Sequence, residues 1–525
     1  MSKVSSYGIK VIRTDTYVFV AVIFLTIYLI LGSGLHGDDY AVISGAQKVS
    51  FYEYFYPSPD KIGASIFNLP NYYLFRWTYF TLGYDYQIIY DLIKVFSISL
   101  SVYLTYRFFT DYLQKDRAFI LSILFCLYPL HDTTSYWYMT FTYVLIPSLI
   151  LFSHHIIRNN KYKIGAPILL ISSFAHYSSP PYVFGLAVIF IFEKKFKKAA
   201  IFAIPGFLYV AYYFWIKFNY AGVERRINTD LSILDFLKKI LLQPISFIES
   251  ALGPSYWLKA FYAIESISLV SMIIVAVISV FAFLKVKKIS KIPLLSKSLL
   301  AGLVSVLILS FGMYALTGLY SHSAFNLGNR STVYGSLFIA FLLVTFLPAN
   351  KKSVAFLLIV FLAPVFGLSD HWKSWNTNQK IVIENIRNNQ DLKAIEHDST
   401  LIITGNIYSK LGSYAHIEFF SMPWNVRAIF EDSTNAKNIV ALTPYVVIND
   451  DYLIDPKFRG KYFLKDKLYV YDSEKDLVKA ISAKDVPELI KHQPIIVRHW
   501  VQLFKDTWVQ NIVVWLSPRL VYLFE

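Results

Sequence analysis

The sequence predicts a polytopic α-helical membrane protein with about eleven transmembrane helices and a small C-terminal α/β domain. Three observations carry this prediction. Of the 525 residues, 55% are hydrophobic and 18% are aromatic, and the mean hydropathy is +0.46. Long apolar runs continue as far as Ser369, and the sequence after it is polar and mixed. Basic residues fall in short clusters between the apolar runs, which is typical of cytoplasmic loops.

Eleven apolar segments make up the predicted membrane domain, which is residues 1–369. They are Tyr17–Leu35, Ile88–Phe109, Ala118–Leu130, Tyr136–Ile157, Ile164–Tyr177, Pro181–Phe192, Ala199–Phe218, Ile264–Leu284, Ser298–Tyr320, Val333–Pro348 and Ser353–Ser369. The first has no small-residue cleavage site and is predicted to stay as a helix. The shortest segments are tilted pairs, re-entrant segments or helices that line a protein cavity.

Charge distribution predicts the orientation of the chain. Lys3, Lys10 and Arg13 precede the first segment and indicate a cytoplasmic N-terminus. Alternate loops carry further basic clusters, which are Arg107, Lys115, Arg117; Arg158, Lys161, Lys163; Lys194, Lys195, Lys197, Lys198; Lys285, Lys287, Lys288, Lys291; and Lys351, Lys352. These clusters account for the net charge of +15, so no nucleic-acid partner is expected. An odd number of spans then puts the C-terminal domain outside the cytoplasm.

Two further regions follow the membrane domain. Residues 370–486 are predicted to form the extracytoplasmic α/β domain, with helices at Ile381–Asn388 and Lys475–Ile481 and strands at Thr400–Thr404, Ile439–Ile448 and Lys467–Tyr471. Residues 487–525 are predicted to form an amphipathic interfacial helix, because Trp500, Phe504, Trp508 and Trp515 recur on one helical face. A twelfth span is the alternative for this tail.

An acidic pair follows the first apolar segment, in the run Gly34-Leu35-His36-Gly37-Asp38-Asp39-Tyr40. Adjacent carboxylates beside a membrane are costly to desolvate, so we expect them to have a function. A carboxylate there would act as a general base on a hydroxyl group, or the pair would bind a divalent cation. The structural alternative is that one aspartate caps the helix that begins near Tyr40.

Other candidate residues lie in loops on the same side as the acidic pair. His131-Asp132 and His176-Tyr177 follow apolar segments, and turns between helices are the alternative explanation for both. His322 and Arg330 lie in the loop Tyr320–Val333, where Arg330 precedes Ser331-Thr332 at a helix start and would grip a phosphate. Arg225 and Arg226, in the loop Phe218–Glu265, are a second cationic candidate.

Some classes of function have no support in the sequence. The single cysteine, Cys126, lies in an apolar run, so no disulfide framework or cysteine metal site is expected. No glycine-rich phosphate loop is present, which disfavours a nucleotide-driven pump. Asp91 and Lys94 lie three residues apart in one predicted helix, where a local ion pair accounts for both.

With an acidic pair after the first span, about eleven spans, polar external loops and a C-terminal α/β domain, the chain resembles the GT-C membrane glycosyltransferases. The run His36-Gly37-Asp38-Asp39-Tyr40 is similar to the acidic motif in their first external loop. In size and in its Lys/Ile/Tyr/Asn-rich composition, the chain resembles bacterial enzymes that add one sugar to O-antigen or another surface polysaccharide, including the serotype-converting glucosyltransferases.

This resemblance implies a multi-pass protein of the bacterial inner membrane. Its donor would be a polyprenyl-phosphate-linked sugar, with glucose as the first choice, and its acceptor a surface polysaccharide or lipid-linked glycan. Asp38 or Asp39 would deprotonate the acceptor in an inverting displacement, and Arg330 is our inferred phosphate ligand. His131, Asp132, His176, Tyr177 and His322 would bind the acceptor or support the site. A glycan polymerase or ligase, a lipid-linked sugar flippase, and a non-catalytic structural protein are the alternatives.

Overall fold

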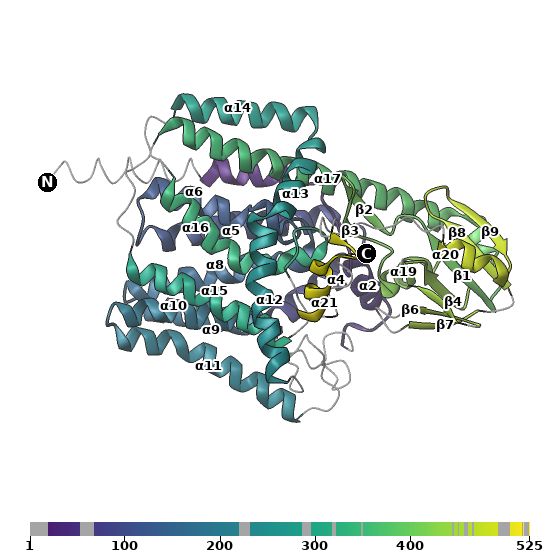
Figure 1. The fold of residues 1–525 in the computed structure, drawn as a ribbon, viewed down its shortest axis with the longest axis horizontal. Helices are drawn as coiled ribbons and strands as arrows, with labels where there is room; N and C mark the ends of the chain where they lie inside the picture. The colour runs from purple at the N-terminus through teal and green to yellow at the C-terminus, as the bar shows by residue number, and fades with distance from the viewer. Residues whose placement is uncertain are drawn as a thin grey trace.

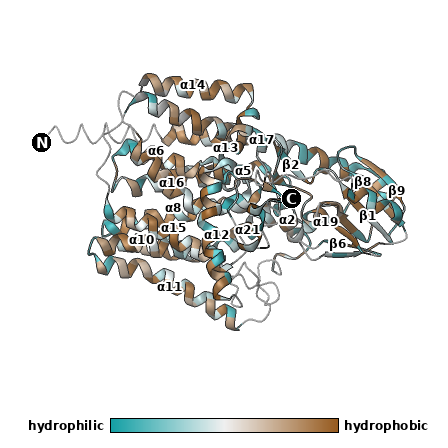
Figure 2. Cartoon of the chain, in the orientation of Figure 1, coloured by the Kyte–Doolittle hydropathy of each residue, from teal (hydrophilic) through white to brown (hydrophobic). Residues whose placement is uncertain are grey.

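The computed structural model describes most of residues 19–524, in two parts that lie side by side (Figure 1). The residues outside the description are 1–18, 53–67, 220–231, 286–295, 318–321, 348–349, 444–445, 450, 456–459, 465–466, 492–503, 517, 519–523 and 525. A bundle of helices forms the first part, and its helices consist mostly of hydrophobic residues (Figure 2). A smaller α/β domain, richer in polar residues, forms the second.

Five stretches of helix are long and apolar enough to cross a membrane, as expected for a membrane protein. They are Gln87–Phe109 (α5), Tyr138–Arg158 (η4 and α8), Phe196–Asn219 (α11), Lys297–Thr317 (α15) and Leu327–Phe346 (η5 and α16). A sixth would be the pair Ile233–Glu265 and Leu269–Phe281, which is bent by 111°. Three shorter apolar helices are Phe19–Ile30, Tyr162–Ala175 (α9) and Ser179–Phe192 (α10).

The predicted count of about eleven spans is therefore not confirmed. Every predicted apolar segment is helical over most of its described residues, and the difference lies in length. Helix α6 (Lys115–Cys126), for example, has only 12 residues, fewer than the 20 or so that a perpendicular crossing needs. Helix α17 (Lys351–Asn388) is the opposite case, with 38 residues.

Close packing inside the bundle depends on small residues. Helices α10 and α15 approach each other at two glycines, Gly185 and Gly302. A Cβ atom at Gly185 would lie 2.5 Å from Val306, and one at Gly302 would lie 2.3 Å from Ile189. Because glycine has no Cβ atom, the backbones of α10 and α15 come close together and gain dispersion energy. Helices in a lipid environment often associate through small residues in this way.

The predicted loop Phe218–Glu265 is wrong from residue 233 onward. Residues 233–265 form two helices, α12 (Ile233–Leu252) and α13 (Pro254–Glu265). Ser232 caps α12 by accepting a hydrogen bond from the backbone N–H of Asp235. Gly253 then separates the helices, and Pro254 begins α13 at the first helical position, where its missing N–H is harmless.

The α/β domain is built on a four-stranded sheet with the order β4-β1-β8-β9. Strand β1 (Ser399–Thr404) is parallel to β4 (Asn438–Ala441) and to β8 (Lys467–Asp472), and β9 (Leu477–Ile481) is antiparallel to β8. The helix predicted at Lys475–Ile481 is therefore wrong. Its alternating apolar residues pair with a neighbouring strand, from Leu468 with Ile481 to Asp472 with Leu477.

Smaller elements complete this domain. A hairpin consists of β2 (Tyr408–Leu411) and β3 (Tyr414–Glu418), and a three-stranded sheet consists of β5 (Val447–Asn449), β6 (Tyr452–Asp455) and β7 (Gly460–Phe463). The helices are α18 (Gln390–Lys393), α19 (Pro423–Phe430) and α20 (Val486–Lys491). Because α17 continues unbroken from the bundle to Asn388, the predicted boundary at residue 370 falls inside a helix.

The α/β domain packs against two short helices of the bundle, α2 (Asp39–Gln47) and α4 (Leu69–Leu82). One hydrophobic cluster joins Tyr40 and Tyr79 from these helices with Phe419 and Val426 from the domain. The domain is thus packed against the bundle through a shared core rather than attached by a linker.

The three predicted basic loops that precede residue 200 meet at one end of the bundle. Arg158 forms an ion pair with Glu193 at 2.6 Å, and His155 contacts Asp111 at 2.9 Å. Lys198 donates to the backbone carbonyl of Arg158 at 2.6 Å. These contacts agree with the common sidedness predicted for the three loops. Within the predicted C-terminal helix, α21 (Trp508–Leu516) is the helix that the structure describes.

Candidate functional site

The acidic pair occupies the junction of the bundle and the α/β domain, where its two members have different surroundings. Asp39 is fully buried. Its Oδ1 accepts a hydrogen bond from the Tyr79 hydroxyl at 2.5 Å, and its Oδ2 accepts from the backbone N–H of His36 at 2.9 Å. Burial raises the pKa of Asp39 to about 7. With both oxygens bonded inside the protein, Asp39 holds the start of α2 in place.

Asp38 is partly exposed and points toward the α/β domain. It lies at the N-cap position of α2 but makes no side-chain capping bond, so the capping explanation does not hold for it. Its Oδ1 instead accepts a hydrogen bond at 2.6 Å from Nε1 of Trp424, at the start of α19. Burial raises the pKa of Asp38, and Glu418 adds to the rise, whereas Trp424 and the charge of Arg330 oppose it.

A glycine-rich segment, residues 32–37, positions the acidic pair. Gly32, Gly34 and Gly37 have φ angles of 91°, 69° and 51°, a left-handed region that favours glycine. Asp91 accepts hydrogen bonds from the backbone N–H groups of Gly32 and Gly34 at 2.8 and 3.0 Å. Lys94, fully buried, donates to the Gly34 carbonyl at 2.8 Å and pairs with Asp91 at 2.8 Å. The predicted ion pair between Asp91 and Lys94 is confirmed. Through these hydrogen bonds it also holds residues 32–37 in place.

Arg330 lies on the bundle side of the same junction. Its guanidinium donates to the Leu327 carbonyl at 2.6 Å and stacks over the Trp137 ring at 5.3 Å from the centroid. A Cβ atom at Gly37 would lie 3.1 and 3.3 Å from Cζ2 and Cε2 of Trp137, so this ring packs against the residue before Asp38. Among the described residues, its buried Nε1 has no hydrogen-bond partner. The charge of Arg330 therefore acts on Asp38, and the Trp137 ring packs against its neighbour Gly37.

His131-Asp132, the second predicted acidic site, is a buried structural centre. Oδ1 of Asp132 accepts from Lys259 at 2.6 Å and from Asn329 at 2.5 Å. Its Oδ2 accepts from Trp372 Nε1 at 2.7 Å and from His416 Nε2 at 2.8 Å. We call Asp132 and these four partners the Asp132 network. It joins helices α13 and α17, the η5 turn and strand β3.

The charge state of the Asp132 network is set by these contacts. Burial alone would raise the pKa of Asp132, but Lys259 and His416 outweigh it and hold the pKa below the ordinary value. Asp132 is therefore ionised, and each of its oxygens accepts two hydrogen bonds from side chains. His131 is buried too, bonded to Thr134 at 2.8 Å and to the Phe125 carbonyl at 3.0 Å. The predicted role of both residues, in binding the acceptor or supporting the site, stays a prediction.

The remaining predicted candidates divide between a buried cluster and a pocket. His176 contacts Ser178 and Tyr334, and His322 contacts Ser331 at 3.4 Å. Both histidines are buried. Arg225 and Arg226 lie outside the described residues. Their predicted role in binding phosphate stays a prediction.

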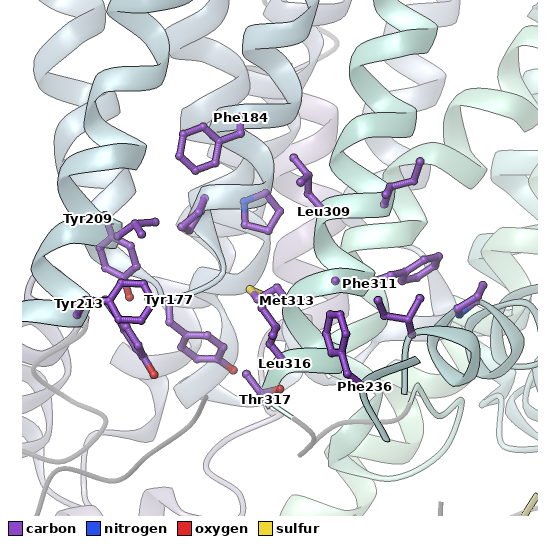
Figure 3. Close-up of a pocket in the computed structure, with 18 residues that line it drawn as sticks. Tyr177, Phe184, Tyr209, Tyr213, Phe236, Leu309, Phe311, Met313, Leu316 and Thr317 are labelled. Carbon is purple, nitrogen blue, oxygen red and sulfur yellow. The ribbon is translucent and has the colours of Figure 1, made fainter. Parts of the chain in front are cut away.

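Tyr177 lines a large apolar pocket between helices α10, α11, α12 and α15 (Figure 3). The pocket has a volume of about 760 Å³, and almost all its walls are hydrophobic side chains. Phe311, in one wall, packs against the His322 ring with 5.6 Å between centroids. The pocket is thus separated by one layer of side chains from the turn that carries Arg330.

A divalent cation shared by the acidic pair stays a prediction. Both oxygens of Asp39 are already bonded to protein donors, and Asp38 turns away toward Trp424. Among the residues that the structure describes, no three acidic, histidine or cysteine side chains are grouped so as to hold a metal ion.

Comparisons with known proteins do not assign the chain to a family. No model of a known protein family matches the chain, and no curated protein does.

Sequence reasoning missed the partners that come from distant parts of the chain. Trp424 lies 386 residues from Asp38, and Lys259 lies 127 residues from Asp132. A signal was present for Lys259, since a lysine within a mostly apolar segment needs a buried partner. Trp424 carried no comparable signal, because nothing in its local sequence points to residue 38.

Proposed function

We propose that the chain is an inverting glycosyltransferase that moves a hexose, with glucose as the first to test, from a polyprenyl-phosphate donor to a surface polysaccharide such as O-antigen. One observation carries the proposal. A partly exposed carboxylate, Asp38, lies at the junction of an apolar helix bundle and a polar domain, bonded to Trp424, with a raised pKa on which the charge of Arg330 acts. A base with a pKa shifted toward the working pH is suited to removing a hydroxyl proton.

The reaction follows from these groups. Asp38 accepts the proton of an acceptor hydroxyl as that oxygen attacks the anomeric carbon of the donor sugar. The bond between the anomeric carbon and the phosphate oxygen breaks on the opposite face, and the lipid phosphate leaves with the bonding electrons. Arg330 stabilises the charge on that phosphate through charge-assisted hydrogen bonds. A phosphate is already a good leaving group, so no second carboxylic acid is needed, in contrast to glycosidases.

The apolar pocket supports a lipid-linked donor. Its hydrophobic walls suit an isoprenoid chain, and it approaches the turn that carries Arg330 through Phe311 and His322. A lipid tail held there would bring its phosphate toward the cation. A flippase has less support, because the charges of Asp91 and Lys94 are already taken up by the segment before the acidic pair.

Sugar transfer by membranes that contain the wild type or an Asn variant tests the proposal. Asp38→Asn keeps the side-chain size but removes the base, so transfer per protein molecule should fall about a hundredfold or more. Asp39→Asn is the matched neighbour and should lose less activity, since Asp39 is bonded on both oxygens. Equal, near-normal transfer by both variants would end the glycosyltransferase proposal. A polymerase or ligase would instead change the length or attachment of the glycan.

The proposed orientation puts the α/β domain on the extracytoplasmic face of a bacterial inner membrane. Cys126 is the single cysteine and is buried, so new cysteines can be labelled without background. An impermeant maleimide added to sealed cells should label Tyr52→Cys and Glu474→Cys, both at exposed positions. It should miss Phe196→Cys at the opposite end. Labelling of position 196 in sealed cells would reverse the orientation.

A further inference from the structure

The α/β domain reaches the proposed active site through one exposed aromatic side chain, Trp424. This residue is 41% exposed, although its Nε1 is bonded to Asp38. Among the described residues of the domain, it is the only exposed tryptophan. The next residues in α19, Asn425 and Val426, are fully buried, so the helix is fixed and holds the indole in place.

The surroundings of Trp424 are polar rather than lipid-like. Glu418, at the end of β3, acts on the charge of Asp38 and so lies close to the same point. Arg427 follows three residues later on the same face of α19 and is exposed. An aromatic ring bordered by charged groups suits a pyranose, whose C–H face stacks on the ring while its hydroxyl groups form hydrogen bonds.

The two sides of Asp38 differ in the substrate that can reach them. Arg330, Trp137 and the apolar pocket belong to the bundle, from which a lipid-linked donor would arrive. Trp424 belongs to helix α19 of the α/β domain, which is the more polar of the two parts (Figure 2). A water-soluble glycan chain would approach from that side. The assignment of this side to the acceptor glycan, the second substrate, rests on the proposed function.

We propose that Trp424 is the platform on which an acceptor sugar stacks, and that its N–H positions Asp38 for that sugar. The N–H occupies Oδ1, which leaves Oδ2 to accept the proton of the acceptor hydroxyl. Trp424 is thus an acceptor-binding residue through its ring and a positioning residue through its nitrogen.

Two substitutions separate the ring from the nitrogen. Trp424→Ala removes both, so the acceptor KM should rise about tenfold, which corresponds to about 1.4 kcal/mol, while the donor KM stays within about twofold. Trp424→Phe keeps an aromatic face and should hold the acceptor KM within about threefold. It loses the N–H that stabilises the Asp38 carboxylate, so the acid limb of the kcat profile should move to higher pH.

Charged groups near Asp38 also influence its pKa and therefore the pH profile of kcat. Asp39 on the same helix, Arg330 from η5 and Glu418 from β3 all act near Asp38. None is changed in the Phe variant, so a moved limb reports the lost N–H. Trp508→Ala, which removes a more exposed indole from α21, is the matched control and should alter neither KM nor the pH profile.

The decisive measurements are the acceptor KM values, with polysaccharide extracted from cells that lack the gene as the probe. An unchanged acceptor KM in Trp424→Ala, or an equal rise in both KM values, would overturn the platform. Binding of the same polysaccharide to Asp38→Asn and to Asp38→Asn/Trp424→Ala gives a readout without turnover. Suppose that the wild type transfers no sugar, that Asp38→Asn binds the polysaccharide and that Asp38→Asn/Trp424→Ala does not. The proposed function would then be wrong, but Trp424 would still be a sugar-binding residue.

Discussion

Asp38 and Asp132 were both predicted as functional acids, yet the protein surrounds them in opposite ways. Asp132 receives four hydrogen bonds from side chains of four elements and is 3% exposed. Asp38 receives one side-chain bond and is partly exposed. The pKa of the first is lowered, whereas that of the second is raised. A carboxylate whose acceptor positions are filled by the protein stabilises the fold, and one with an oxygen left over can take a proton.

The largest expected effect on stability comes from the Asp132 network. Lys259→Met leaves the Asp132 charge buried beside fewer donors, so the free energy of unfolding should fall by about 3–5 kcal/mol. Thermal unfolding of the purified protein measures the loss. Lys467→Met, which breaks an exposed pair with Glu396, is the control and should change little. Equal unfolding temperatures in both variants would remove the distinction between the two acids.

The next effect concerns the segment that aims Asp38. Gly34→Ala puts a side chain at a φ of 69° and a Cβ only 2.1 Å from Asn376 Oδ1. A displaced base loses its alignment with the acceptor, so turnover should fall more than about tenfold. Gly45→Ala, in α2 with nothing within 4 Å of the new Cβ, should keep full activity. Full activity in the Gly34 variant would mean that residues 32–37 do not position the base.

A smaller effect is expected at Arg330. Arg330→Ala should raise the donor KM about tenfold, with the acceptor KM unchanged, because a phosphate loses its charge-assisted bonds. Arg330→Lys should recover only part of the affinity, since lysine keeps the charge but lacks the two-pronged geometry. Normal donor kinetics in the Ala variant would leave Arg330 as an anchor for lipid headgroups.

A separate effect, on stability rather than on activity, is the pH dependence contributed by Asp39. Its pKa is about 7 in the folded protein against an ordinary value of 3.8, so folding favours the protonated form. The resulting stability is complete below about pH 4 and is lost as the pH rises through 7. The unfolding temperature of the wild type should therefore fall relative to that of Asp39→Asn between pH 5 and 7, and level off above 8. A constant difference across this range would contradict the assignment.

The sequence alone predicted much of the secondary structure in the bundle but not its tertiary contacts. Apolar runs show where helices form, whereas the number that cross a membrane depends on lengths such as that of α6. Lys475–Ile481 has a composition that suits either a helix or a strand, and its pairing with β8 decided between them. The acidic pair was visible because its members are adjacent. The bond from Trp424 to Asp38 joins residues 386 positions apart, and no local pattern encodes it.

The most direct test of the account measures sugar transfer and folded yield together for Asp38→Asn and Asp132→Asn. For Asp38→Asn, the account predicts a normal folded yield and a loss of transfer per folded molecule of about a hundredfold or more. For Asp132→Asn, it predicts that the loss appears mainly in folded yield, because an amide cannot accept four hydrogen bonds beside Lys259 and His416. Near-normal transfer per folded molecule by Asp38→Asn would contradict the account.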